Sequence, residues 1–352
     1  MATSGTVSTT TFNTRQVVDR AFGRCKLRPQ QISSEDLSIA QQNLYLLLSA
    51  LANKGVQLWC VEKIIVPLYE GLANVTLPLG TVDILNANYR SLTRLEGTYS
   101  TSAGGDADLA FDNDFDTACV QTSADGNISV EFDTATQVTT VGLLPDATAA
   151  LDLVFERSDD GLVWTQVDAT GEVAATDEEW LWWDIDGNEA ALYFRVRETG
   201  GATLTARELF IGNTPLEIPL GRLNQDDYTA FPNKTFQGQP LQYWLDRARD
   251  QPVMNTWPVC SNAYRYSQFT VWRQRYIQDV GTLTESLDIP QRWFDAIVDD
   301  LAWRTARDHP EVPDERMAVL RALAAESYNA AYAEERDNSP MRLAPAITAY
   351  TR

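Results

Sequence analysis

Hydrophobic residues near the C-terminal end of the chain, in residues 290–333, recur at helical spacing. Positions 293, 294, 297, 298, 301 and 302 are apolar, which is typical of an amphipathic helix. Pro290 suits its first turn, and Pro310 and Pro313 interrupt it. Asp314 is a good N-cap for a second helix, whose apolar face would carry Met317, Leu320, Leu323, Ala324 and Tyr328. Neither helix can bury its stripe alone, so both need partners.

The first 55 residues predict those partners as two further helices. One has Thr14 as its expected N-cap and carries the apolar residues Val17, Val18, Ala21 and Phe22. The other begins at Ser33 or Ser34, where Ser33-Ser-Glu-Asp36 has the spacing of a capping box. Its apolar residues are Leu37, Ala40, Leu44, Leu47, Leu48 and Leu51. We predict that these helices and the C-terminal pair form one bundle.

Between the two helical ends the pattern changes to that of strands. Body strands are predicted at 56–69, 75–79, 82–90, 241–246 and 264–277, with a loop at 252–258. From residue 97 to 213, short strands alternate with Gly, Asp and Asn turns, as in a β-sandwich. Its predicted strands are 126–132, 138–143, 151–157, 180–184, 192–198 and 206–211, with Trp182 expected to face opposite to Trp180 and Trp183. The fold class is therefore α+β.

Charge divides the chain in the same way. Residues 97–213 hold 4 Arg, no Lys and 23 Asp or Glu, a net charge of −19 out of −21, so the rest carries −2. The near-neutral part is split around the acidic part, as an inserted domain requires. We predict a body in two parts, 1–96 and 214–336, a sandwich at 97–213, and an extended arm at 337–352. Neither part has a dense basic stripe for gripping DNA phosphates.

Composition excludes several classes of protein. No apolar run approaches the ~20 residues of a membrane span, and the first residues do not resemble a signal peptide. Four scattered cysteines without a CxxC motif indicate a reducing compartment and no zinc site. His309 is the only histidine, and no P-loop, GxGxxG or HExxH motif occurs. No carboxylate pair stands out as that of a glycosidase, so we expect a protein that is not an enzyme.

One loop gathers oxygen ligands of the kind that calcium prefers. Asp112, Asn113, Asp114, Asp116 and Thr117 lie within six residues of one another. Asp and Asn also favour ordinary turns, so the loop has two interpretations, a cation site and a plain turn.

The body resembles the head-to-tail adaptors of short-tailed phages, also called tail tubular protein A. The similarity lies in the Thr14-Arg-Gln-Val-Val-Asp-Arg-Ala-Phe22 helix, the following Ser-Ser-Glu-Asp start, and Ile289-Pro-Gln-Arg-Trp-Phe-Asp-Ala-Ile297. It covers roughly 235 residues in two blocks around the acidic part. In that family, helices from both chain ends pack together above a β-rich portion, and the subunits form a twelve-fold ring beneath the portal.

This resemblance implies a structural protein of the virion, located at the head–tail interface and assembled in the host cytoplasm without a membrane. The ring would extend the portal channel, retain the packaged genome and hold the next tail component, a nozzle, hub or fibre protein. DNA would pass through the ring without sequence-specific binding. The family docks C-terminal residues on the portal, which here implies a docking arm with Pro340, Met341, Leu343, Pro345, Ile347 and Tyr350.

The acidic part resembles the discoidin or galactose-binding-like sandwiches, which are jelly-roll-like and antiparallel. The matching segments are Ala110-Phe-Asp-Asn-Asp-Phe-Asp-Thr117, Ser158-Asp-Asp-Gly-Leu-Val-Trp164, Tyr193-Phe-Arg-Val196 and Arg207-Glu-Leu-Phe-Ile-Gly212. The resemblance implies a structural calcium held by Asp112, Asp114 and Thr117 and closed by Glu208. The family usually has Trp shortly after the Thr, where this chain has Ala118-Cys-Val120. The alternative function is thus a carbohydrate-binding, adhesin-like virion module, and a hydrolase is the third.

Overall fold

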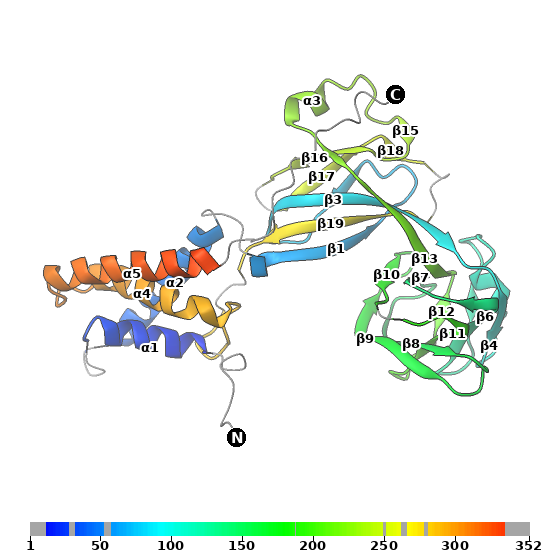
Figure 1. The fold of residues 1–352 in the computed structure, drawn as a ribbon, viewed down its shortest axis with the longest axis horizontal. Coiled ribbons are helices and arrows are strands. Elements are labelled where there is room, and N and C mark those ends of the chain that lie inside the picture. Colours follow the sequence, from blue (N-terminus) through cyan, green and yellow to red (C-terminus); the bar gives the residue numbers. More distant parts are fainter. Residues whose placement is uncertain are drawn as a thin grey trace. The chain divides into compact units, whose positions relative to one another are not determined.

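A computed structural model describes residues 12–27, 32–52, 58–186, 188–248, 251–261, 266–277 and 281–334. The chain divides into two compact units, residues 1–62 with 274–352 and residues 63–273. The first unit is helical and the second is built mainly from strands (Figure 1). The α+β class and the antiparallel sandwich are confirmed. Among the described residues, no helix combines the length and the hydropathy needed to cross a membrane.

The elements of the helical unit are α1 (Thr14–Arg24), α2 (Ser34–Ala52), the short 3-10 helix η3 (Leu58–Cys60), α4 (Gln291–Asp308) and α5 (Asp314–Glu334). The N-cap of α1 is Asn13, one residue before the predicted Thr14, because Asn13 and Gln16 form a capping box. Ser33 and Asp36 exchange hydrogen bonds at the start of α2, as their spacing predicts. Pro290 is the N-cap of α4, one position before its first turn.

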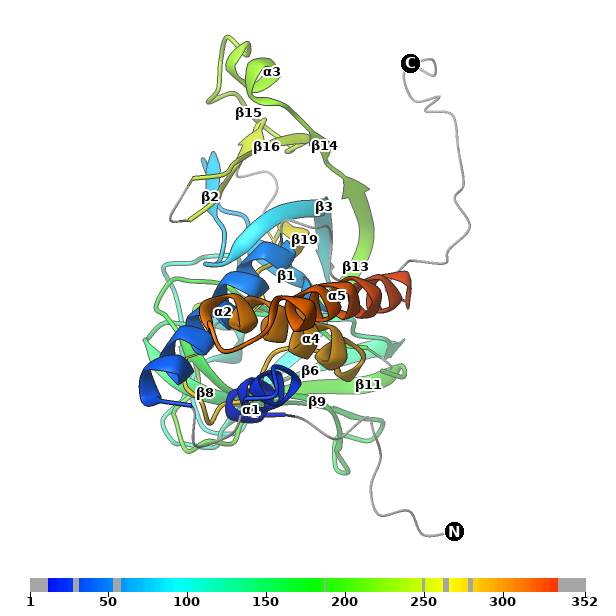
Figure 2. The same ribbon diagram turned by 90° about the vertical axis from the view of Figure 1, so that its left-hand side faces the viewer.

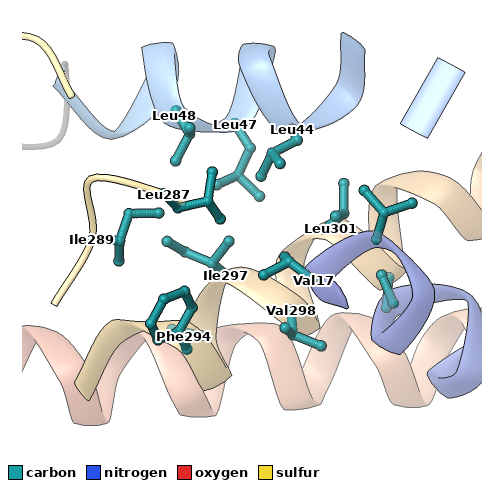
Figure 3. Packing of buried hydrophobic residues seen from close by; sticks show 14 of the residues in the cluster. Val17, Leu44, Leu47, Leu48, Leu287, Ile289, Phe294, Ile297, Val298 and Leu301 are labelled. Atoms are coloured by element: carbon teal, nitrogen blue, oxygen red, sulfur yellow. The ribbon is translucent and has the colours of Figure 1, made fainter. Parts of the chain in front are cut away.

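Helix α4 lies at the centre of this unit and contacts α1, α2 and α5 (Figures 2 and 3). Residues from both ends of the chain share one hydrophobic core, in which Val17 and Leu44 pack with Trp293 and Leu301. Burying these apolar stripes contributes more to helix stability than intrinsic propensity does. Leu323 is exposed, contrary to the prediction, because the buried stripe of α5 is narrow and consists of Leu320, Ala324 and Ala331.

A six-stranded sheet runs through the second unit. Its order is β1 (Val61–Pro67), β19 (Gln268–Arg275), β3 (Thr81–Arg94), β13 (Glu208–Pro219), β7 (Thr140–Leu144) and β10 (Leu181–Asp184). The β1–β19–β3 half shares a core with a four-stranded sheet of β14 (Gly221–Arg222), β16 (Gln242–Asp246), β17 (Val253–Trp257) and β2 (Asn74–Thr76). The predicted loop at 252–258 is wrong, because β17 buries Met254 and Thr256 in alternation while the prolines lie just outside it.

The sandwich uses the other half of that sheet. Strands β13, β7 and β10 share a core with a five-stranded sheet of β4 (Thr98–Thr101), β6 (Asn127–Thr136), β11 (Ala191–Glu198), β8 (Ala149–Ser158) and β9 (Thr165–Ala175). Phe155, Phe194 and Leu209 are fully buried between the two layers. Strand β9 was not predicted from the sequence. Almost all of its residues are at least partly exposed, so the segment has no alternation of apolar and polar residues.

Short elements complete the strand-built unit. They are η4 (Ala107–Ala110), β5 (Cys119–Val120), β12 (Thr205–Ala206), α3 (Gln225–Thr229), β15 (Gln237–Gly238) and β18 (Val259–Cys260). The predicted orientation of Trp182 is right relative to Trp183 and wrong relative to Trp180. Its ring stacks on Trp180 at a centroid distance of 4.8 Å, while Trp183 packs on Phe155, because residues two apart share one face of an extended chain.

Strand β13 joins the sandwich to the rest of the strand-built unit. Its first residues, Glu208 to Gly212, pair with β7 inside the sandwich, and from Gly212 to Pro219 it pairs with β3. The strand therefore continues past residue 213, the predicted end of the sandwich. The predicted domain bounds stay a prediction, while the sheet itself is continuous between the two parts.

Candidate functional site

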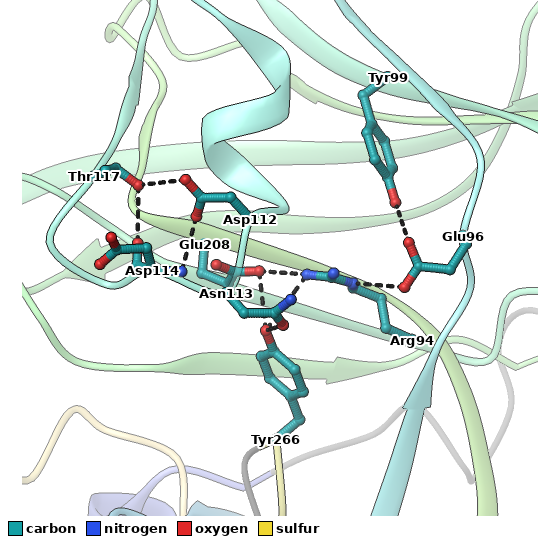
Figure 4. Close-up of polar contacts among 9 residues, drawn as sticks. All are labelled: Arg94, Glu96, Tyr99, Asp112, Asn113, Asp114, Thr117, Glu208 and Tyr266. Atoms are coloured by element: carbon teal, nitrogen blue, oxygen red, sulfur yellow. Dashed lines mark hydrogen bonds and ion pairs between the residues drawn. The ribbon is translucent and has the colours of Figure 1, made fainter.

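Arg94 and Glu208 form an ion pair where β3 ends and β13 begins (Figure 4). The antiparallel register, in which Arg94 lies opposite Gly212, sets these strand ends side by side. Arg94 Nη1 lies 2.5 Å from Glu208 Oε1, and the two side chains are 8% and 0% exposed. Moving a guanidinium and a carboxylate from water into the protein interior costs free energy, which their mutual attraction offsets. If one of the two residues were removed, the other charge would stay buried without its opposite charge.

The surroundings of Glu208 disfavour its ionised form. Burial raises the pKa of Glu208 to about 7, although the positive charge of Arg94 and the hydrogen bond from Tyr266 act in the opposite direction. The nearby carboxylate of Asp112 contributes to this rise in pKa. Near neutral pH this carboxylate therefore depends on Arg94 for its ionised form.

Tyr266 brings a third segment of the chain to the pair, from just before β19. Its hydroxyl lies 3.0 Å from Glu208 Oε1 and within hydrogen-bond distance of Asn113 Oδ1, and its single proton can be donated to one of them at a time. The Arg94 guanidinium carbon lies 5.8 Å from the ring centroid of Tyr266 and 5.9 Å from that of Phe111. These are cation–π distances, so the arginine is held by two rings as well as by a carboxylate.

The predicted calcium ligands of the acidic loop hydrogen-bond within the loop itself. Asp112 Oδ1 accepts from the Asp114 backbone N–H at 2.8 Å, and its Oδ2 accepts from the Thr117 hydroxyl at 2.8 Å. Asp114 Oδ1 accepts from the Asp116 backbone N–H at 3.1 Å. The two bonds from backbone N–H groups are those of Asx turns, and the bond from Thr117 joins two side chains of the same loop. The loop thus adopts the turn geometry that its composition also favours.

Glu208 lies near this loop but is bound to Arg94 and Tyr266. The carboxylate that would have to close a cage of oxygen ligands with Asp112, Asp114 and Thr117 is therefore occupied by Arg94. In the part of the chain that the structure describes, no group of three or more His, Cys, Asp or Glu side chains is placed to hold a metal ion. The residues as arranged do not fit calcium, which would need six to eight converging oxygens.

Arg94 and Tyr266 were missed by the sequence analysis. One available signal was a charged residue at an inward position of a strand, because such a residue needs a buried partner. Tyr266 carried no such signal, since its position beside Glu208 depends on tertiary structure alone.

An aromatic cluster surrounds the ion pair where the sandwich meets the body strands. Phe210 and Trp180 are buried, and Tyr266 packs against both at centroid distances of 5.3 and 5.8 Å. Tyr69 adds a polar contact, since its hydroxyl accepts a hydrogen bond from the Trp180 backbone N–H at 2.8 Å. This end of the sandwich is closed by side chains of the body strands.

A second polar surface lies at the turn between β8 and β9. It contains a cavity of about 220 Å³, which is lined by Arg157, Ser158, Asp159, Asp160, Val163 and Thr165. A different cavity, of about 510 Å³, lies in the helical unit. Hydrogen bonds from the backbone N–H groups of Val163 and Leu162 lower the pKa of Asp160. The guanidinium of Arg195 covers the Trp164 ring at 4.0 Å. The turn thus combines polar groups with the ring of Trp164, one face of which is covered by Arg195.

The remaining predicted residues are placed as follows. His309 is the C-cap of α4, and its ring meets Phe22 edge-on at 5.7 Å. The four cysteines are all buried and free of disulfides. The predicted docking-arm residues Pro340, Met341, Leu343, Pro345, Ile347 and Tyr350 lie outside the described residues.

About a third of the chain is similar to solved carbohydrate-binding modules, family 32 modules among them. A pectin-binding carbohydrate-binding module is 16% identical, with a TM-score of 0.30, over 34% of this chain and 93% of the module. A family 32 module from a Clostridium perfringens family 31 glycoside hydrolase is also 16% identical, with a TM-score of 0.30, over 34% of this chain and 97% of that one. The family 32 module of C. perfringens NanJ, solved with galactose, is 16% identical, with a TM-score of 0.30, over 36% and 99%.

At these identities the likeness concerns the fold. No protein-family profile matches the chain, and no curated protein matches it.

Proposed function

We propose that this protein is a structural subunit of a virion, a head-to-tail adaptor that forms a ring beneath the portal. The observation that carries the proposal is the single core that α1 and α2 share with α4 and α5. The resemblance to phage adaptors implies this arrangement, with an extra domain inserted between the two halves. The proposed function is assembly, and it assigns the chain no reaction.

Exposed apolar residues on the helical unit support assembly as the function. Tyr45 and Leu46 of α2 are 52% and 55% exposed, and Val319 and Leu323 of α5 lie one helical turn apart and are also exposed. Single exposed apolar residues are ordinary, but adjacent pairs on long helices suit contacts with a neighbouring subunit. A closed ring requires two different complementary surfaces on each subunit, and we assign one to each helix.

Charge supports a channel that does not hold DNA. Outside residues 97–213 the chain is close to neutral, and within them it is strongly acidic. Phosphate contacts from Lys and Arg would slow the passage of a genome, so a connector works best with a neutral or acidic bore. The proposed partners are further copies of this chain, in a twelve-fold ring, the portal protein above it and a tail nozzle, hub or fibre protein below it.

Electron-microscopic images of the full chain, alone and mixed with its portal protein, test this proposal. Rings, or a ring added to the portal, are the expected result. Monomers that never associate with the portal at micromolar concentration would contradict it.

Carbohydrate binding is the second candidate, and the turn between β8 and β9 favours it. The polar cavity there is lined by Val163 and Thr165, the residues on either side of Trp164 in the chain, and sugar sites combine hydrogen-bonding groups with an aromatic ring. A glycan array probed with the full chain tests this candidate, with Asp159→Ala as the variant. Binding that this exposed substitution abolishes would establish the site, and the absence of binding to every glycan would reject it.

A further inference from the structure

The ion pair between Arg94 and Glu208 occupies the place where the sequence resemblance implies a calcium ion. We infer that the guanidinium of Arg94 is the resident cation of this acidic loop, so that the sandwich is held together without calcium. The inference concerns how the sandwich is stabilised and is independent of the proposed adaptor function.

Arg94 makes one contact that a bound cation would make, the one to Glu208. Its Nη1 lies 2.5 Å from Glu208 Oε1, the carboxylate that the resemblance assigns to calcium. A guanidinium can neutralise one buried carboxylate and direct its other N–H groups toward a second one. Arg94 Nε lies 3.5 Å from Glu96 Oε1. With Glu208 neutralised in this way, a divalent ion would have to displace a covalently attached charge whose effective concentration is high.

The loop that would supply the other ligands is stable without a metal ion. Both carboxylate oxygens of Asp112 accept hydrogen bonds, from Asp114 and from Thr117. A carboxylate oxygen that accepts one hydrogen bond keeps a lone pair for a cation, so these bonds hold the loop in shape without excluding calcium. What calcium would have to displace is the ion pair between Arg94 and Glu208.

The arginine also connects the sandwich to the body strands. Its guanidinium lies over the ring of Tyr266, whose hydroxyl contacts Glu208 and Asn113. The backbones approach closely here, since a Cβ on Gly212 would lie 2.3 Å from the Thr93 carbonyl oxygen. One side chain thus neutralises the buried carboxylate and joins three segments of the chain. A calcium ion could neutralise the buried carboxylate without joining these three segments.

Thermal unfolding of the full chain, followed with calcium or with EDTA, tests the inference. The wild-type Tm is expected to be the same in both, because the internal cation is covalently attached. Arg94→Met should lower the Tm by several degrees and make it rise with calcium, since Glu208 then keeps the Tyr266 hydroxyl but loses its positive partner. Arg94→Lys should lie between the two. The matched control is Arg157→Met, whose ion pair with the exposed Glu189 should contribute little.

Two results would overturn the inference. One is a wild-type Tm that falls in EDTA and recovers with calcium, and the other is an Arg94→Met Tm equal to that of the wild type. If Arg94→Met does not fold, the double variant Arg94→Met/Glu208→Gln is used to test the inference instead. Folding of that variant without calcium supports the pairing, because no unpaired buried charge remains, and failure to fold counts against it.

Discussion

Arg24, the last residue of α1, forms an ion pair with Asp299, which α4 buries to 7% exposure. The two residues come from opposite ends of the chain. The same arginine also pairs with Asp295, and its backbone carbonyl accepts from Arg316 Nη2 at 2.7 Å. Helices α1, α4 and α5 thus meet at one residue, and the apolar core beside it is fixed by polar contacts as well as by burial.

The first prediction follows from this contact. Arg24→Met should destabilise the protein by about 1–3 kcal/mol, because Asp299 is then left buried without its cation. Chemical denaturation followed by tryptophan fluorescence measures the change. Arg15→Met is the matched control, since its pair with Asp19 is exposed and should contribute less than about 1 kcal/mol. Equal losses in the two variants would refute the role assigned to Arg24.

The second prediction concerns acid sensitivity at the end of β10. Burial raises the pKa of Asp184, but hydrogen bonds from Arg90 and Lys63 outweigh it, so the pKa lies below the usual 3.8. A carboxyl whose pKa is lower in the folded state stabilises the protein above its unfolded pKa. This stabilisation is lost as the pH falls through the folded-state pKa.

Asp184→Asn should therefore cost about 1–3 kcal/mol at neutral pH. The difference from wild type should shrink as the pH falls below 3.8. Urea unfolding at several pH values measures it, with the exposed Asp133→Asn as the control. A difference that is the same at every pH would show that the charge of Asp184 is not what stabilises this site.

Elements that depend on local spacing could be predicted from the sequence. Ser33 and Asp36 mark the start of α2 because a capping box is complete within four residues. The buried face of α4 likewise follows from a spacing of three and four residues along one segment. In these cases the signal lies in the same residues that form the structure.

The candidate site could be predicted only in part. Glu208 and the acidic loop were identified from local motifs, but Arg94 and Tyr266 were not. These two meet Glu208 only because β3, β13 and the segment before β19 come together in one unit. Predicting a buried cation requires the register of distant strands, which no local pattern contains. Consequently, the sequence alone could not distinguish a calcium ligand from the partner of an arginine.

The third prediction concerns the C-terminal arm. The arm lies outside the described residues, so this prediction is based on its sequence. Deleting residues 338–352 should leave the Tm within about 2 °C, because the shared core of the helices ends before the arm. It should abolish attachment to the portal protein if the arm docks there. Pull-down of portal protein by the full and the shortened chain measures this. Equal capture would reject the arm as the docking element.

The fourth prediction separates ring assembly from folding. Leu46→Asp and Leu323→Asp change exposed residues of α2 and α5, so each should alter the free energy of unfolding by less than about 1 kcal/mol. Each should prevent ring formation if these helices meet in the ring, because an unpaired carboxylate in an apolar interface is strongly unfavourable. Leu162→Asp is the matched control, since Leu162 is 83% exposed, more than any other large apolar residue that the structure describes, and belongs to the sandwich. Sedimentation velocity measures the oligomer in all three variants. Rings that survive both helix substitutions would place the subunit interface elsewhere, whereas loss of rings in the Leu162 variant would assign it to the sandwich.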